Sequence, residues 1–319
     1  MKRIIALTMA LMMLLMLTAC GGAAPADDGK YTIGICQLVT HDALDAATKG
    51  FQDAVIAGLG EENVTFDLQN AAGDANTCAS IANAFVAAEV DLIMANATPA
   101  LQNAQAATAD IPILGTSVTE YGVALGLDNF QGVVGGNVSG TSDLAPLVDQ
   151  AAMLQTWFPD AKKVGLLYCS AEPNSKYQVD TIEALLKEMG YECKMFPFAD
   201  SNDMQAVTTG ACEYADVIYV PTDNAVASAT DIIDGICRPA GVPIIAGEEG
   251  ICSGCGVATL SISYYDLGYK TGEMAVQILK GEADISTMEI AYAPATAKYN
   301  PEICEDLNLT PPEGYIAIG

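Results

Sequence analysis

Short apolar runs alternate with amphipathic stretches along the chain after residue 30. The runs are rich in β-branched residues, as in buried strands, and occupy residues 32–36, 64–68, 91–95, 112–114, 163–168, 192–196, 216–220, 243–246 and 257–261. Between them apolar residues recur at helical spacing, at residues 42–57, 76–88, 99–108, 143–157, 175–189, 203–211 and 224–237. This alternation predicts an α/β fold with mostly parallel sheets and right-handed crossovers.

The stretch at residues 31–51 contains the first complete strand, turn and helix of this pattern. Its strand is followed by a few polar residues, and Asp42 stands where it could cap the N-terminus of the helix. In open parallel sheets, the turn at the carboxyl end of a strand is where ligands bind. We therefore expect one wall of a binding site at residues 37–45.

The strand pattern repeats once, in the same order. Residues 32–37 correspond to 163–168, residues 90–95 to 215–220, and residues 111–116 to 242–247, with separations of 131, 125 and 131 residues. Three matches in register indicate two lobes of similar topology.

We therefore predict two doubly wound, Rossmann-like lobes. The last 60 residues begin no third lobe, and we expect them to pass back and forth between the two as part of a multi-strand hinge. The predicted boundaries are residues 31–142 plus 264–291 for the first lobe, and 143–263 plus 292–319 for the second.

The N-terminus has the pattern of an export signal. Lys2 and Arg3 precede an apolar stretch at residues 4–17, which is too short to span a bilayer comfortably. The sequence Leu-Thr-Ala-Cys20-Gly resembles a bacterial lipobox, so residues 1–19 are predicted as a lipoprotein signal peptide and Cys20 as the lipidated residue. An ordinary secretory signal with a chance cysteine is the alternative. Residues 20–30 would form a short tether.

The charge of the chain excludes some partners. The sequence has 40 acidic and 13 basic residues, and two of the basic residues lie in the signal. Such a surface repels nucleic acid and anionic lipid, so neither is an expected partner of the body. A distant, screened charge does not identify the ligand.

Cysteine and histidine patterns do not favour a metal site or catalysis. Nine cysteines remain beyond Cys20, irregularly spaced, and only Cys252 and Cys255 have a CxxC spacing, which fits a local disulfide or two plain thiols better than zinc. His41 is the only histidine, and we expect it to pack or hydrogen-bond at a cleft rim. No nucleophile elbow, P-loop or GxGxxG motif appears. We predict no enzyme activity, no metal and no cofactor.

Polar residues gather where the repeated strands end. Since the carboxyl ends of both sheets would face a common cleft, we expect these residues to converge on it. They are Gln37, Thr98, Thr116 and Ser117 from the first lobe, and Ser170, Glu172, Asn174, Thr222, Asp223, Asn224 and Glu248 from the second.

An ordered set of motifs resembles the ABC-transporter substrate-binding lipoproteins of the TrpX-like group, which have the type I periplasmic-binding-protein fold. It comprises Ile33-Gly-Ile-Cys-Gln37, His41-x-Ala-Leu-Asp45-Ala-Ala-x-x-Gly50-Phe51, Gln69-Asn-Ala-x-Gly73-Asp74, Ala97-Thr98-Pro99-Ala100, Gly136-Asn-Val-Ser-Gly140-Thr-Ser-Asp143, Glu172-Pro-Asn-Ser175, Val220-Pro-Thr-Asp-Asn224 and Tyr264-Tyr-Asp-Leu-Gly268-x-x-x-Gly272. Residues 247–250, Gly-Glu-Glu-Gly, depart from the Ser-Asp that members often have there.

The resemblance implies capture of a small ligand in the interlobe cleft and its delivery to a membrane ABC permease and ATPase. Several members bind aromatic amino acids, so an aromatic or other apolar amino acid is the expected ligand. The implied ligand-binding residues are Gln37, His41, Leu44, Thr98, Thr116, Ser117, Asp143, Ser170, Glu172, Asn174, Asp223, Asn224 and Tyr264, and Glu248 joins them from its place at a strand end.

An amino acid needs donors for its carboxylate and an acid for its ammonium. Thr98, Thr116 and Ser117 offer hydroxyls near helix N-termini, Asp223 could bind the ammonium, and Asn224 could orient it. Thr98 and Asp223 could instead simply cap the helices that follow them. An apolar ligand side chain could rest on Leu38, Leu44, Tyr121 or Tyr264, although core packing would explain these residues equally well.

The expected protein is a monomer, extracytoplasmic and anchored to the membrane through Cys20. A sensor of the same fold, which signals to a membrane partner without transport, is the alternative. A LacI-like regulator core shares the lobes but needs an N-terminal DNA-binding helix-turn-helix, and here that position holds the export signal.

Overall fold

The computed structural model describes residues 29–318 of the chain. The predicted signal peptide and Cys20 lie outside these residues. The elements discussed below belong to one unit, Tyr31–Gly319. A search of the described residues finds no helix with the length and apolar character needed to cross a membrane.

The first sheet has six strands among the described residues, in the order β11-β5-β4-β3-β1-β2. Every neighbouring pair is parallel. The strands are β1 (Tyr31–Gln37), β2 (Val64–Asn70), β3 (Leu92–Asn96), β4 (Ile113–Val118), β5 (Val138–Ser142) and β11 (Ala291–Tyr292).

The second sheet has seven strands within residues 29–318, in the order β13-β12-β10-β9-β8-β6-β7. Its pairs are parallel except for β10 with β12. The strands are β6 (Lys163–Cys169), β7 (Glu192–Phe198), β8 (Val217–Val220), β9 (Ile244–Ala246), β10 (Ala258–Ser261), β12 (Thr296–Tyr299) and β13 (Ile316–Ala317).

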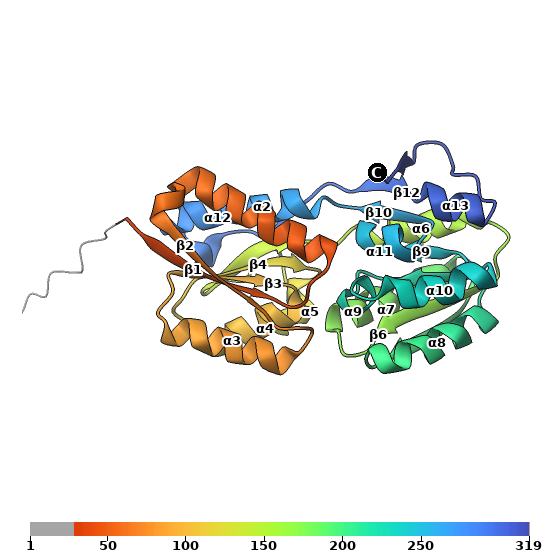
Figure 1. Cartoon of the computed structure of the whole chain (residues 1–319), viewed down its shortest axis with the longest axis horizontal. Coiled ribbons are helices and arrows are strands. Elements are labelled where there is room, and N and C mark those ends of the chain that lie inside the picture. The colour runs from red at the N-terminus through yellow and green to blue at the C-terminus, as the bar shows by residue number, and fades with distance from the viewer. Residues whose placement is uncertain (1–28, 319) are drawn as a thin grey trace, which may run out of the picture. The chain divides into compact units, whose positions relative to one another are not determined.

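The two sheets have the same strand order over their first five strands. Strands β2-β1-β3-β4-β5 correspond to β7-β6-β8-β9-β10, which confirms the repeat read from the sequence. The predicted α/β architecture with two doubly wound sheets is therefore confirmed. Figure 1 shows the two groups of elements, and the blue helix α12 lies in the first group beside the red helix α2.

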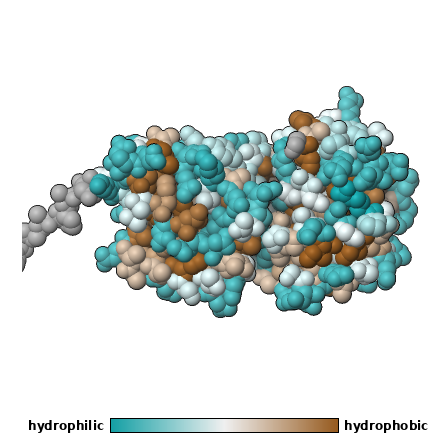
Figure 2. Space-filling model, in the orientation of Figure 1, coloured by the Kyte–Doolittle hydropathy of each residue, from teal (hydrophilic) through white to brown (hydrophobic). Residues whose placement is uncertain are grey.

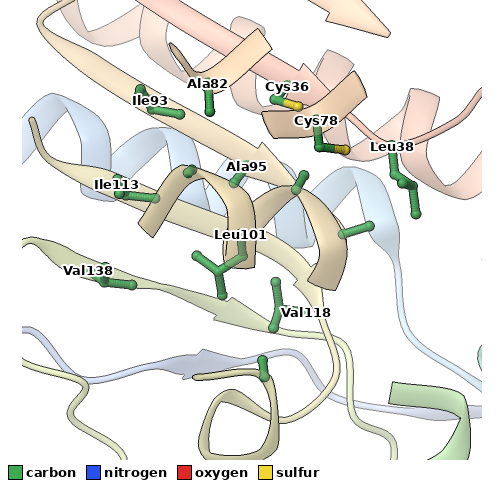
Figure 3. Packing of buried hydrophobic residues seen from close by; sticks show 14 of the residues in the cluster. Cys36, Leu38, Cys78, Ala82, Ile93, Ala95, Leu101, Ile113, Val118 and Val138 are labelled. Atoms are coloured by element: carbon green, nitrogen blue, oxygen red, sulfur yellow. The ribbon is translucent and has the colours of Figure 1, made fainter. Parts of the chain in front are cut away.

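Helices cover both faces of the first sheet because its strands are apolar on both sides. On one face α2 and α12 pack against Ile33, Leu92 and Leu114. On the other, α3 and α4 pack against Cys36 and Ile93, as Figure 3 shows. The helices are α2 (Asp42–Leu59), η1 (Glu61–Asn63), α3 (Ala75–Ala87), α4 (Thr98–Ala107), α5 (Tyr121–Leu125), α12 (Tyr264–Leu279) and η2 (Ile285–Thr287).

The second sheet is covered in the same way. Helices α6, α7 and α13 pack on the face of Val164 and Tyr219, and α8, α10 and α11 pack on the face of Leu167 and Ile218. The helices are α6 (Leu147–Trp157), α7 (Pro173–Glu188), α8 (Ser201–Tyr214), α9 (Asn224–Ala227), α10 (Thr230–Ala240), α11 (Glu249–Cys255) and α13 (Pro301–Asp306).

The chain passes between the elements of the two sheets at residues 143–146, 262–263 and 293–295. The helix expected at residues 143–157 begins only at Leu147, because Pro146 at its N-cap restricts the backbone before it. Strand β5, which the sequence analysis did not include among the expected strands, leads directly into the first of these crossings. The lobe boundaries themselves stay a prediction.

Helices α2 and α12 lie side by side although they are far apart in the sequence (Figure 1). A Cβ atom on Gly268 would stand 1.9 Å from the backbone oxygen of Ala47, and one on Gly50 would stand 2.1 Å from that of Tyr265. Glycine at these positions lets the two backbones approach closely. This packing fixes the start of α12, where Tyr264 lies.

Candidate ligand-binding site

The carboxyl ends of the two sheets meet in this structure. His41, at the start of α2, lies with Nε2 3.3 Å from Oδ1 of Asn224, which follows β8. The amide nitrogen of Asn224 donates to Glu172, so its oxygen faces the imidazole. Burial lowers the pKa of His41. His41 therefore makes a hydrogen bond, one of the two roles expected for it, and its part in ligand binding stays a prediction.

Grooves lined by both groups of elements flank this contact. The larger, of about 600 Å³, is lined from the first sheet by Leu38, Asp74 and Pro99, and from the second by Glu172 and Asn224, among others. Its volume is in the range of about 300–1,000 Å³ that small-molecule sites occupy. A smaller groove of about 250 Å³ is lined by His41 together with residues at the ends of α9 and α11.

Two neighbouring strands of the first sheet end in strained backbone. Ala97, after β3, has φ 93°, and Ser117, at the end of β4, has φ 54°. Positive φ is uncommon for residues other than glycine and gathers at functional sites. The Oγ of Ser117 is buried and has no hydrogen-bond partner. Ala97 directly precedes Thr98, the buried first residue of α4.

Asp143 stands at the first crossing between the sheets, directly after β5. Its Oδ2 accepts a hydrogen bond of 2.9 Å from the hydroxyl of Tyr264, at the start of α12. Its Oδ1 is buried without a partner. Burial raises the pKa of Asp143 to about 6, and the negative charge of Glu172 adds to the shift.

Glu172 joins the first turns of α7 and α9 through hydrogen bonds. Its Oε2 accepts from the backbone and side-chain nitrogens of Asn224, at 3.1 and 2.6 Å, and from Nδ2 of Asn174 at 3.1 Å. Its Oε1 accepts from the backbone N–H of Ala225 at 2.9 Å. Asn174 also donates to the carbonyl of Thr222, which leaves its Oδ1 buried and unpartnered.

Two further buried acids are committed to backbone donors. Asp223 accepts from the N–H of Cys169 at 2.7 Å and from that of Val226 at 3.0 Å, so it caps α9 and ties that helix to the end of β6. Glu248 caps α11 through the N–H groups of Gly250 and Ile251. Burial raises the pKa of each carboxyl group to about 7, an effect that the backbone donors partly offset.

Three of the seven buried side-chain atoms that have no hydrogen-bond partner among the described residues lie near the meeting edges of the sheets. They are Ser117 Oγ at the end of β4, Asp143 Oδ1 directly after β5, and Asn174 Oδ1 in the first turn of α7, which follows β6. A buried polar atom without a partner costs about 1–3 kcal/mol, so native structures retain few of them. Together they offer one hydroxyl, one carboxylate oxygen and one amide oxygen to a ligand.

Several predicted site residues have internal roles in this structure. Gln37 donates to Val39 and Asp45 and accepts from Thr48, so it fixes the turn after β1. Thr116 pairs with Thr141 at 3.2 Å.

Leu44 and Tyr121, two of the residues considered as contacts for an apolar ligand side chain, are part of the core. Leu44 is only 1% exposed and packs in the apolar cluster. Tyr121 is equally buried, and its hydroxyl donates to the carbonyl of Thr141.

Other positions differ from their expected surroundings. Ser170 is exposed, and its hydroxyl donates to the carbonyl of Phe198, so it is not part of the buried polar set. The N-cap of α2 is His41, and no side chain caps this helix, so the capping role expected for Asp42 was wrong.

Two positions were missed by the sequence interpretation. The positive φ of Ala97 could not be predicted from the sequence, since alanine ordinarily has a negative φ. Gln178, 1% exposed on α7, accepts from the N–H of Thr222 and donates to its carbonyl, so it holds the turn before Asp223. A glutamine inside the apolar face of a helix was the available signal.

The cysteines of the described residues are all free thiols. Cys252 and Cys255 lie on α11 and donate to backbone carbonyls, which fits two plain thiols. Within residues 29–318, no group of three or more His, Cys, Asp or Glu side chains could hold a metal ion.

Comparison with known proteins places this arrangement in a family. The family described as "ABC transporter substrate binding protein" matches residues 32–316. A tyrosine-binding protein from Clostridioides difficile (strain R20291) is 40% identical over 280 residues, which cover 84% of this chain and 81% of that protein.

Solved structures agree with this match. The ABC domain from Streptococcus pneumoniae in complex with L-Trp has a TM-score of 0.85 and 31% identity, over 91% of this chain and 100% of that one. A substrate-binding protein with adhesive properties from Clostridium difficile, in a ligand-free, open structure, has a TM-score of 0.69 and 38% identity, over 90% and 99%.

A more distant structure shows the fold alone. The leucine-binding protein of Thermotoga maritima has a TM-score of 0.63 at 14% identity, over 87% of each chain. The family resemblance predicted from the motifs is confirmed, and this family acts outside the cytoplasm, as solute-binding proteins rather than enzymes. The chain belongs to the ABC transporter substrate-binding protein family.

Proposed function

We propose that the chain binds a single α-amino acid with an aromatic side chain between the ends of its two sheets. The observation that carries the proposal is the set of buried, unpartnered atoms on Ser117, Asp143 and Asn174. The names of two relatives point to the same ligand class, since one is called a tyrosine-binding protein and the other was solved with L-Trp.

Asp143 is the best partner for the ligand's ammonium group. Of the four buried acids at the meeting edges, it alone keeps a buried oxygen without a hydrogen bond. A hydrogen bond between charged groups is stronger than a neutral one, and an ammonium would offset the cost of burying the carboxylate. This replaces Asp223 as the preferred acid, because both of its oxygens already accept backbone N–H groups.

The ligand's carboxylate needs neutral donors. The lining of the 600 Å³ groove contains neither lysine nor arginine among the described residues, and Ser117 and Asp143 lie outside that lining. The free hydroxyl of Ser117 and the N-terminal turn of α4 at Thr98 supply a hydroxyl donor and a partial positive charge instead. Side chains that accept and donate at fixed positions would distinguish an amino acid from an amine or an acid.

The relative arrangement of the two sheets is more similar to that of a ligand-bound relative than to that of an open, ligand-free one. Sequence identity is higher to the open, ligand-free structure, at 38%, than to the Trp complex, at 31%. Structural similarity is nevertheless higher to the Trp complex, with a TM-score of 0.85, than to the open structure, with a TM-score of 0.69. Binding proteins of this kind close by hinge bending, so the contact of His41 with Asn224 would belong to the closed form.

Within this proposal the protein is a lipid-anchored receptor that delivers its ligand to an ABC permease and its ATPase. The lipobox around Cys20 supports the anchor, and the family match supports the transport system. Replacing Cys20 with alanine should release the protein from the membrane fraction, and continued anchoring would contradict the lipobox interpretation.

A thermal-shift screen of the twenty amino acids tests the proposed ligand class. A ligand at about 100 times its Kd stabilises by roughly 2.7 kcal/mol, which raises the Tm of a chain of this size by about 4–5 °C. We expect this shift with at least one aromatic amino acid. Silence across all twenty, with peptides or nucleosides positive, would overturn the proposal.

A further inference from the structure

Two thiols on neighbouring helices of the second sheet lie in direct contact. Sγ of Cys212, on α8, is 3.2 Å from Sγ of Cys237, on α10, and the residues are 25 positions apart. The CxxC pair, Cys252 and Cys255, makes no such contact, since each thiol donates to a backbone carbonyl. Sequence spacing therefore indicated a different pair from the one that the fold brings together.

We propose that Cys212 and Cys237 form a redox-active dithiol that is oxidised to a disulfide by small-molecule disulfides outside the cell. A disulfide needs a sulfur separation of about 2.0 Å, so the two atoms must approach by only about 1.2 Å. Extracytoplasmic compartments are oxidising enough for protein disulfides to persist.

The two thiols differ in access, and this difference sets the order of the reaction. Cys212 is partly exposed, whereas Cys237 is 1% exposed beneath it. The hydrogen bond from Cys237 lowers the pKa of Cys212 and so favours its thiolate, which is the attacking form. Cys212 is therefore the nucleophile and Cys237 the resolving thiol.

The exchange is balanced in two steps. The thiolate of Cys212 attacks one sulfur of the small disulfide, whose S–S bond breaks and releases one small thiolate that takes up a proton. Cys237 then loses its proton and attacks the sulfur of Cys212, which releases the second small thiol. Two protein thiols are oxidised, and one small disulfide is reduced to two thiols.

A second thiol pair in the first sheet provides an internal control. Cys36 and Cys78 belong to one apolar cluster, and Figure 3 shows both sulfur atoms within the core between β1 and α3. They are 1% and 0% exposed. Since a small disulfide cannot reach them in the folded protein, they should remain reduced while Cys212 and Cys237 react.

The test treats the full folded chain with oxidised glutathione, alkylates the remaining thiols, and maps linked peptides by mass spectrometry. We expect a Cys212–Cys237 link, a Cys36 and Cys78 pair that is alkylated only after unfolding, and a rise in Tm of about 5 °C on oxidation. A folded protein that reacts at neither thiol, or that links Cys212 to another cysteine, would overturn the proposal.

Matched variants separate the two roles. Cys237→Ala should leave Cys212 as a stable mixed disulfide with glutathione, whereas Cys212→Ala should give no mixed disulfide on Cys237. Neither variant should gain stability on oxidation. If Cys237→Ala shows no glutathione adduct, or if Cys212→Ala shows one, the assignment of attacking and resolving thiols is wrong.

Discussion

Asp143 and Asp223 are both buried acids at the meeting edges of the sheets, but their hydrogen bonds give them different roles. Asp223 has a backbone donor on each oxygen, while Asp143 has a tyrosine hydroxyl on one oxygen and nothing on the other. The first arrangement stabilises a turn, and the second leaves a charge available to a ligand. Each role leads to a separate test.

Asp143→Asn should weaken binding of an aromatic amino acid by about 10–150-fold, because a hydrogen bond to a charged group contributes about 1.5–3 kcal/mol. The change keeps the shape of the side chain and an acceptor for Tyr264. Asp149→Asn, on the exposed start of α6, removes the same charge away from the site and should leave the affinity unchanged. Calorimetric titration measures both, and equal affinities would exclude Asp143 as the ammonium partner.

Asp223→Ala should act mainly on stability. It removes a helix cap and leaves the buried N–H of Cys169 without a partner, which together cost about 2–4 kcal/mol. Chemical denaturation of the ligand-free protein measures this loss. If stability is unchanged while affinity falls more than in Asp143→Asn, then Asp223 binds the ligand and Asp143 has the structural role.

At the scale of elements, the close contact between α2 and α12 depends on glycine residues, which have no side chain where the two backbones meet. Gly268→Ala would place a methyl group against the backbone of Ala47, so we expect a loss of about 1–3 kcal/mol, the usual cost of overpacking. Gly235, on α10, has nothing within 4 Å of an added Cβ, and Gly235→Ala should be neutral or slightly stabilising. Equal Tm values for the two variants would show that the helices separate without cost.

The regular elements were largely predictable from the sequence because β-branched runs and helical spacing recur twice. Strand β5 was missed since its residues, Val-Ser-Gly-Thr-Ser, are mostly small and polar, and their burial comes from neighbours that local sequence does not reveal. Site residues at strand ends were predictable as a group. Their individual roles were not, because the partner of Asp223 at Cys169 lies 54 residues away.

The surface of the whole molecule is acidic, with a formal net charge of −27, and Figure 2 shows apolar residues scattered among hydrophilic ones on the face in view. Buried acids add a specific dependence on pH. Asp143, Asp223 and Glu248 all have a pKa raised by burial, to about 6, 7 and 7, from ordinary values of 3.8, 3.8 and 4.5.

A raised pKa in the folded state means that the folded protein holds these protons more tightly than the unfolded chain. The resulting stability is complete below about pH 4 and is lost as pH rises toward 6 to 7. The Tm of the ligand-free protein should therefore fall between pH 5 and pH 8, and Asp143→Asn should reduce this slope. A Tm that rises over this interval in both proteins would contradict the burial of uncompensated carboxylates.

The proposed function depends on recognition of both charged ends of an aromatic amino acid. Isothermal titration of the wild-type protein with L-tyrosine, tyramine and 4-hydroxyphenylpropionate compares the complete ligand with analogues that lack the carboxylate or the ammonium. We predict saturable binding of one L-tyrosine, and at least about tenfold weaker binding of each analogue. Absence of binding for L-tyrosine and every other aromatic amino acid, or equal affinity for all three compounds, would contradict this recognition.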